Sequence, residues 1–299
     1  MIKSAFFFTA AAAIIWGATI PIMKLTLAQV PLFSLAFIRM LCASLILAPL
    51  IYKNLKIQKN DLPSFVWAAL TGVTLNLTFF FIGIKLTEAI LAAFLVASVP
   101  IFTMVAAHFY LKEKLTLRLI LASIIAILGV FIIIGKLGAG LDLRQFLGNL
   151  FLLAATLFWV AHEIISKKLL KKYEASTVTF YAMAIGAVSF FPLFLTELVK
   201  NPFWFAGVDA SGIGGLLYGI FFASLIAYWA WHKGLALLPA GQASFFFYLD
   251  PISGSILSII LLGEKITPQL IVGGLFIIIG VLLAEQHRKS HPLHQQTKL

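Results

Sequence analysis

The sequence predicts an all-α integral membrane protein with ten transmembrane helices, built as two inverted five-helix repeats. Three observations lead to this fold class: the composition, the number of long apolar runs, and an internal sequence repeat. Of the 299 residues, 62% are hydrophobic and 11% are charged, against roughly 45–50% apolar and ~25% charged in ordinary soluble proteins. So few polar residues cannot cover the surface of a water-soluble globule, which excludes the soluble classes.

The ten spans follow from the length of the apolar runs. A transmembrane helix needs about 20 mostly apolar residues, and clusters of Lys, Pro, Asn and Gly separate the runs in this chain. The predicted spans are 4–23, 32–52, 64–84, 89–111, 118–135, 146–166, 176–199, 212–233, 239–262 and 268–285. We expect helices because apolar runs this long do not fit the alternating strands of a membrane barrel. The first run exceeds the ~7–15 apolar residues of a signal peptide and is therefore predicted to remain as a span.

The basic residues orient these spans. With the N-terminus inside, fifteen of the 22 Lys and Arg residues fall on the inner side and six fall in the opposite loops, while Arg39 lies inside the second span. The positive-inside rule then places both termini of this multi-pass membrane protein in the cytoplasm. Because the charge is spread between apolar runs, we expect a lipid bilayer and no nucleic acid as the partner.

An internal repeat divides the chain into halves. Residues 83–130 align with 234–281 without a gap, and sixteen of the 48 positions are identical. The informative identities are Gly83/Gly234, Pro100/Pro251, Glu113/Glu264 and Gly129/Gly280. Because each half has five spans, an odd number, the second half must enter the membrane from the opposite side. Such inverted repeats are typical of carriers that work by alternating access.

Several residues recur in both halves in a pattern that resembles a known family. The first half carries Trp16-Gly17, Lys24, Arg39, Pro100 and Glu113, and the second carries Trp159, Lys167, Pro251 and Glu264. This pattern resembles the EamA-type permeases of the drug/metabolite transporter superfamily, with one repeat over 5–135 and the other over 147–284. Residues 285–299 are then a basic cytoplasmic tail. The resemblance implies a multi-pass, ten-helix carrier in the cell inner (plasma) membrane, and several members export amino acids or related metabolites.

Seven residues are predicted to line a substrate cavity. They are Trp16, Arg39, Asn76, Trp159, Tyr228, Tyr248 and Asp250. Trp16 and Trp159 are repeat-related and lie deep in their spans, so they are expected either to face each other across the pseudo-axis and stack on cargo or to pack as ordinary core. Asn76, Tyr228 and Tyr248 contribute hydrogen-bonding groups at similar depths and would serve equally well as helix–helix contacts.

Two of the seven are ionisable, and an ionisable group inside a span costs at least ~2.5–3.5 kcal/mol. Asp250 either binds a proton or cation that drives transport, or is a buried acid satisfied by Arg39 or by hydroxyls. Arg39 either holds a substrate carboxylate or forms a structural pair with Asp250, and the resemblance favours the structural role. A further hypothesis is that these two residues are coupled across the cavity.

Other residues carry predictions about movement and packing. The repeat-related Pro100 and Pro251 are expected to kink their helices and to act as hinges. His162 and Glu163 lie near the cytoplasmic end of the sixth span and have two interpretations. They are explained either by an i,i+4 pair of Glu163 with Lys167 or by snorkelling, or they form a cytoplasmic gate.

The sequence therefore predicts a secondary-active transporter of small organic solutes, with export of amino acids or related metabolites favoured and protons as a candidate coupling ion. The alternative is an importer or exchanger of a nucleotide sugar, phosphorylated sugar or host-derived metabolite. An enzyme is not expected, because the ionisable groups are isolated, and a channel is not expected, because Arg39 and Asp250 lack repeat partners. We expect no cofactor, no metal site and, without a P-loop motif, no ATP hydrolysis. The oligomeric state and the substrate stay open.

Overall fold

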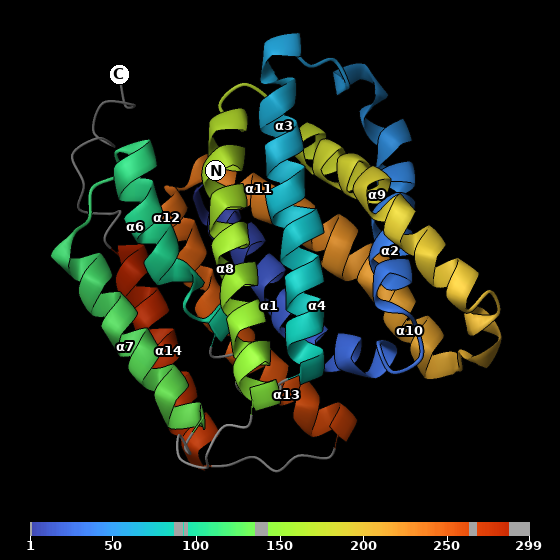
Figure 1. The fold of residues 1–299 in the computed structure, drawn as a ribbon. Coiled ribbons are helices and arrows are strands. Elements are labelled where there is room, and N and C mark those ends of the chain that lie inside the picture. The colour runs from blue at the N-terminus through green and yellow to red at the C-terminus, as the bar shows by residue number, and fades with distance from the viewer. Residues whose placement is uncertain (1, 87–91, 93–94, 135–142, 263–267, 287–299) are drawn as a thin grey trace.

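A computed structural model describes residues 2–86, 92, 95–134, 143–262 and 268–286 (Figure 1). Within these ranges the chain is helical and contains no strand. Seven helices are long and apolar enough to cross a membrane: 3–26, 32–51, 59–86, 146–169, 175–200, 210–237 and 240–261. Three shorter apolar helices lie at 99–111, 117–129 and 271–283, and they overlap the predicted fourth, fifth and tenth spans. The ten-span count therefore stays a prediction.

The first half consists of helices separated by short turns. It contains α1 (Ile2–Thr26), α2 (Leu32–Ile51), α3 (Leu62–Ala69), the π-helical stretch η3 (Leu70–Leu75), α4 (Asn76–Leu86), α6 (Val99–Leu111) and α7 (Leu117–Ile134). The elements α3, η3 and α4 run on without interruption, so they form a single long helix with a widened turn at its centre.

The second half has the same order. It contains α8 (Leu143–Leu169), α9 (Ala175–Lys200), α10 (Ala210–Tyr218), the π-helical stretch η5 (Gly219–Ile226), α11 (Ala227–Leu237), α12 (Ala240–Ser244), the 3-10 turn η6 (Phe245–Leu249), α13 (Asp250–Leu262) and α14 (Pro268–Gln286).

Both halves depart from regular helix at matching places. A shift of 151 residues maps the end of η3, Leu75, onto the end of η5, Ile226. The same shift maps Val99, where α6 begins after a turn at 97–98, onto Asp250, where α13 begins after η6. Pro100 and Pro251 are thus the second residues of their helices, a position that needs no backbone N–H. Helix interruptions at these prolines agree with the expected kinks, and whether they act as hinges stays a prediction.

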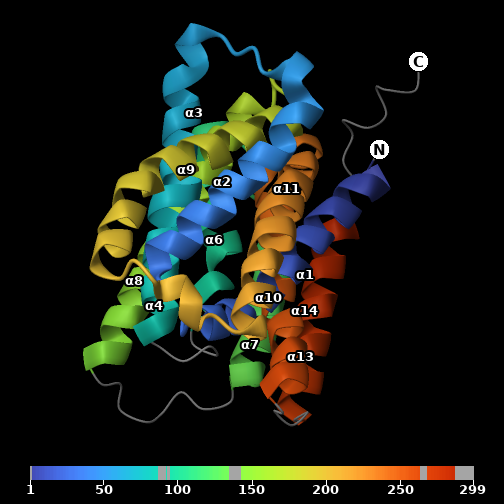
Figure 2. The ribbon, with the colours of Figure 1, turned by 90° about the vertical axis from the view of Figure 1, so that its right-hand side faces the viewer.

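The packing of the helices is arranged in matching pairs (Figures 1 and 2). Helix α1 packs on α11 and α13, and its repeat equivalent α8 packs on α4 and α6. Helix α2 packs on its own equivalent α9, and α7 packs on its own equivalent α14 along the side of the bundle. Large apolar side chains on α7 and α14, such as Ile124 and Ile279, point outward and are half exposed, as expected for a surface that faces lipid.

Partly buried carboxylates cap two of the helices. Both oxygens of Glu113 accept backbone N–H groups at the start of α12, from Ala240 at 2.7 Å and Gly241 at 3.1 Å. Glu197 does the same for α2, accepting from Phe33 at 3.0 Å and Ser34 at 2.6 Å. A carboxylate satisfies the free N–H groups and the partial positive charge of a helix start. Glu264, the repeat equivalent of Glu113, lies outside the described residues, as does the tail beyond Gln286.

Candidate functional site

One cavity lies where both halves of the chain meet. Its lining comes from α1, α2, α4, α8 and α11 and from the breaks that precede α6 and α13. The space open to the centres of water molecules is about 90 Å³, and one water needs about 10–15 Å³ by this measure. The cavity is therefore several times larger than the space that one water needs, and it can hold several waters or one small organic molecule.

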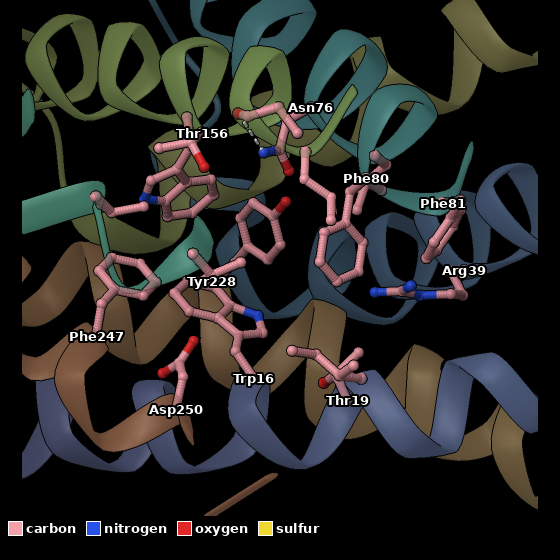
Figure 3. Close-up of a pocket in the computed structure, with 17 residues that line it drawn as sticks. Trp16, Thr19, Arg39, Asn76, Phe80, Phe81, Thr156, Tyr228, Phe247 and Asp250 are labelled. Atoms are coloured by element: carbon pink, nitrogen blue, oxygen red, sulfur yellow. Dashed lines mark hydrogen bonds between the residues drawn. The ribbon is translucent and has the colours of Figure 1, made fainter. Parts of the chain in front are cut away.

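Six of the seven predicted cavity residues surround this space (Figure 3). They are Trp16, Arg39, Asn76, Trp159, Tyr228 and Asp250. The structure thus brings together residues that lie up to 234 positions apart in the sequence. Both halves contribute, and most of the remaining lining is apolar.

Aromatic rings form one wall of the cavity. The Trp16 ring contacts Trp159 edge-to-face at 5.0 Å and Tyr228 edge-to-face at 5.3 Å, and it stacks parallel to Phe247 at 5.7 Å. The two repeat-related tryptophans therefore meet at the junction of the halves. Aromatic walls of this kind bind flat or cationic groups through their ring faces.

Arg39 lies at one side of the cavity and is anchored to the π-helical stretch η5. Its Nε donates to the Gly219 carbonyl and to Ser224 Oγ, each at 3.2 Å, and its guanidinium lies 5.6 Å from the centre of the Phe81 ring. The side chain is 2% exposed. Nη2 makes no hydrogen bond to a described residue, so this edge of the guanidinium is available to an acidic group.

Asp250 lies at the other side, below Phe247 and Trp16 in Figure 3. It is the first residue of α13, and its Oδ1 is buried without a hydrogen-bond partner among the described residues. Arg39 and Asp250 are both described, and they form no ion pair; the described ion pair is between Lys172 and Asp61 on the surface. The expectation that Arg39 satisfies Asp250 directly is therefore wrong. A buried carboxylate without a partner costs much free energy when it is charged, so Asp250 stays a candidate for the predicted proton or cation site.

The π-helical stretches explain how the polar groups are held. A π-turn leaves a backbone carbonyl without its usual helical partner, and such turns occur often at functional sites. In η5, Ala223 O accepts from Trp16 Nε1 at 3.0 Å; in η3, Gly72 O accepts from the Tyr228 hydroxyl at 2.9 Å. Asn76 Nδ2, just after η3, donates to Ala155 O at 2.9 Å. Asn76 and Tyr228 thus both line the cavity and hold helices together.

Tyr248 is the predicted residue that the structure places elsewhere. Residues 245–249 form a tight 3-10 turn, and this turn directs Phe247 into the cavity. Tyr248 instead belongs to a buried cluster on the side toward α7 and α14, together with Met104, Ala122 and Ile277. Sequence reasoning also missed Thr19, Phe80, Phe81, Thr156 and Phe247. The segments Leu70–Leu75 and Gly219–Ile226, which form the irregular turns, carry no distinctive composition that would have marked them in the sequence.

The predicted surface pair of Glu163 and Lys167 does not form. Glu163 is fully buried, and its Oε2 accepts a hydrogen bond from the Thr103 hydroxyl on α6. Lys167 instead donates to the carbonyls of Leu235 at 2.6 Å and Leu238 at 2.5 Å, at the end of α11. A cation at this place satisfies the free carbonyls of a helix end. The described ranges contain no group of three or more His, Cys, Asp or Glu residues that could hold a metal ion.

The sequence of this chain is similar to the sequences of known transporter proteins. The sequence matches the EamA-like transporter family over residues 3–135 and again over 146–285. It is 28% identical to an uncharacterized transporter of Archaeoglobus fulgidus, over 92% of this chain and 96% of that protein. It is 25% identical to the uncharacterized transporter YetK of Bacillus subtilis, over 90% and 85% of the two chains.

Two further similarities are more limited. A probable terminal-alkyne amino-acid exporter of Streptantibioticus cattleyicolor is 30% identical over 44% of this chain and 43% of that protein. A solved crystal structure of a protein superposes with a TM-score of 0.79 and covers 97% of this chain and 100% of that one; at 16% identity this shows a shared fold. With seven candidate spans, and with family matches that together cover most of its length, the chain is a multi-pass membrane protein that belongs to the EamA-like transporter family, within the drug/metabolite transporter superfamily.

Proposed function

We propose that the protein is a secondary-active carrier that exports small organic solutes, amino acids or related metabolites, across the cell inner membrane by alternating access. The observation that carries this proposal is the cavity between the two halves, which has aromatic walls and places one cationic and one acidic side chain, Arg39 and Asp250, at its two sides. An amino acid offers a carboxylate to the first and an ammonium group to the second. The cavity volume suits a solute of this size.

The proposal includes ten spans in two inverted five-helix repeats, 5–135 and 147–284. Its support is the pairing of equivalent contacts, α1 with α11 and α8 with α4, together with the helix irregularities that recur at equivalent positions. The family also matches the chain twice. Two halves of similar structure can exchange roles with little change in energy, and this exchange opens the cavity to each side in turn.

The breaks before Pro100 and Pro251 are proposed as the hinges of this exchange. Each separates a helix into two parts next to the cavity, and a helix break absorbs changes in backbone angle without loss of regular hydrogen bonds. Asp250 begins the helix after one of these breaks, so a ligand bound to Asp250 contacts the moving element directly.

The alternative, a carrier of nucleotide sugars or phosphorylated sugars, has less support. Phosphate groups are held by several cationic donors, whereas Arg39 is the one cationic side chain among the described cavity residues. The partial likeness to a probable amino-acid exporter also favours amino acids. Protons are proposed as the coupling ion, because the buried Asp250 carboxylate can bind one.

The test is mass-spectrometric profiling of medium and cytosol from cells that express wild type, Asp250→Asn or no carrier, each with and without a protonophore. We expect an amino acid or related metabolite to appear in the medium with wild type only, and the protonophore to stop its export. The matched control is Asp209→Asn, a surface acid outside the cavity, which should export like wild type. Accumulation inside the cells, or export of phosphorylated solutes, would favour the alternative.

A further inference from the structure

A buried histidine pair lies next to the cavity, and the proposed transport mechanism does not use it. His162 on α8 and His232 on α11 are both fully buried, with their Nε2 atoms 3.2 Å apart. His162 lies one turn from Trp159 on α8, with ring centres 5.0 Å apart, and His232 lies one turn from Tyr228 on α11. The pair therefore lies directly beyond the aromatic wall, toward the helix ends predicted to face the cytoplasm.

The hydrogen bonds around the pair determine where its protons lie. His162 Nδ1 is 2.8 Å from the Ala68 carbonyl, which can only accept, so this nitrogen carries a hydrogen. His162 Nε2, in a neutral ring, is then an acceptor for Nε2–H of His232. The remaining nitrogen, His232 Nδ1, is 2.7 Å from the Thr179 hydroxyl.

Thr179 allows the network to exist in two states, one neutral and one with a single added proton. Its hydroxyl is also 2.8 Å from the Ala175 carbonyl, so its single hydrogen has two possible acceptors. When His232 is neutral, Thr179 donates to His232 Nδ1. When His232 is doubly protonated, the hydroxyl turns to Ala175 and accepts from Nδ1. Both states satisfy every ring nitrogen without moving a heavy atom, which is unusual for a buried pair that merely packs.

The surroundings of the pair in this structure disfavour a positive charge. On α8, Glu163 follows His162, but its carboxylate accepts from Thr103 on α6. Lys167, one turn beyond Glu163, is a cation, so it would repel a positive charge on the histidine pair. On α11, the Tyr228 hydroxyl donates to Gly72 O and makes no hydrogen bond to either imidazole. The described parts of α9 and α3 contribute only Thr179 and the Ala68 carbonyl to the pair. No described carboxylate contacts either ring, and a buried charge without an opposite charge is costly.

We propose that His162 and His232 form a proton-binding site between the cavity and the cytoplasm, and that binding one proton there opens the cytoplasmic end of the carrier. A hydronium ion delivers the proton, which forms an N–H bond at His232 Nδ1 and leaves one water molecule. The positive charge is then shared between the two rings through the Nε2–H···Nε2 hydrogen bond. Opening hydrates the charged pair, so the open state binds the proton more tightly and acid shifts the population toward it. The consequence for transport rests on the proposed carrier function, whereas the opening itself does not.

The experiment measures opening without any solute. In a Cys42→Ala background, the cavity residue Thr156 is replaced by Cys, and inside-out vesicles of the full chain are labelled with a membrane-impermeant maleimide between about pH 5 and 8, a range that brackets histidine titration. Each rate is divided by that of the unfolded protein at the same pH. We expect the rate to rise as the pH falls, by about tenfold per pH unit at most, as one proton requires.

Variants locate the proton. His162→Gln and His232→Gln should label at a rate that does not depend on pH, and the exposed His108→Gln should behave as the parent does. Thr179→Ser keeps the hydroxyl and should retain the pH dependence, whereas Thr179→Val should change it. A pH dependence that survives both histidine substitutions, or that disappears instead in Asp250→Asn or Glu163→Gln, would overturn the proposal.

A second measurement needs no variant at the pair. Nitrogen NMR of the full chain in lipid nanodiscs, with 15N-labelled histidine, should reveal a hydrogen bond between two histidine ring nitrogens and the uptake of one proton by that pair. A pair that stays neutral over the whole range would refute the proton site. If the pair responds to pH while cells export no solute, the proposed carrier function fails instead, so the two failures are distinguishable.

Discussion

At the scale of the residue, Arg39 shows how a charged side chain can be both structural and functional. Its Nε is bound to the backbone and hydroxyl of η5, while its other edge faces the cavity. Because the lining acid Asp250 makes no ion pair with it, the two charges remain separate features of the site. A solute with both an acidic and a basic group would pair with the charges of Arg39 and Asp250 at the same time.

Replacement of Arg39 should weaken the fold as well as the site. We expect Arg39→Gln to lower the free energy of unfolding by ~1–3 kcal/mol, the cost of leaving buried partners of a hydrogen bond unsatisfied. Thermal unfolding in detergent or bilayer measures this loss. The control is Arg144→Gln, because Arg144 is exposed and makes one long contact of 3.5 Å with Lys85 O. Equal stability of the two variants would contradict the anchoring role.

Asp209 should make unfolding depend on pH in the acid range. It caps the start of α10, and hydrogen bonds from Ser211, the Gly212 backbone and Gln29 lower its pKa to about 2. Because the folded pKa lies below the unfolded value of about 3.9, the stabilisation is present above pH ~4 and is lost as the pH falls toward ~2. We expect Asp209→Asn, which can still cap but cannot titrate, to remove this dependence in thermal unfolding measured across that range. An unchanged pH profile would show that another acid is responsible.

At the scale of the element, the close approach of α1 and α13 sets the position of Asp250. A Cβ added at Gly17 would overlap the backbone of Asp250 and the Ser253 hydroxyl. The glycine is therefore required by the distance between two helices. Its place beside Trp16 in the sequence gave no sign of this contact.

Gly17→Ala should therefore separate these two helices. We expect it to lower the free energy of unfolding by ~1–3 kcal/mol through overpacking and to reduce export by displacing Asp250. The matched control is Gly214→Ala on α10, where an added Cβ meets nothing within 4 Å; that change should be neutral or should stabilise by ~0.4–1 kcal/mol. Thermal unfolding and metabolite export measure the two effects, and a harmless Gly17→Ala would refute the tight contact.

At the scale of the whole molecule, the repeat explains why the cavity lies where it does. The contacts of one half recur in the other, and α1, α4, α8 and α11 from the two halves all line the cavity. Residues that are not repeated, among them Arg39 and Asp250, make this symmetric space chemically asymmetric. A carrier needs such asymmetry to bind a solute in one orientation.

The predicted orientation can be tested with introduced cysteines. In a Cys42→Ala background, Asn60→Cys lies in the loop before α3 and Asn201→Cys in the loop after α9, and both positions are exposed. We expect an impermeant maleimide to label Asn201→Cys in intact cells, and Asn60→Cys only after permeabilisation, because the positive-inside rule places the first loop in the cytoplasm. The opposite pattern would invert the orientation, and labelling of both in intact cells would reject the span count between them.

The sequence by itself determined the membrane class, the helical state and the division into related halves, because these depend on composition, on the length of apolar runs and on identities along the chain. It also identified six of the seven cavity residues it proposed, since deep polar and aromatic side chains have few other places to lie. Only the tertiary structure decided that Phe247 and not Tyr248 faces the cavity, that Glu163 contacts Thr103, and that His162 meets His232. The physical reason is that a 3-10 or π turn rotates the helix face after it, and that the partner of a buried polar group is set by the neighbouring helix.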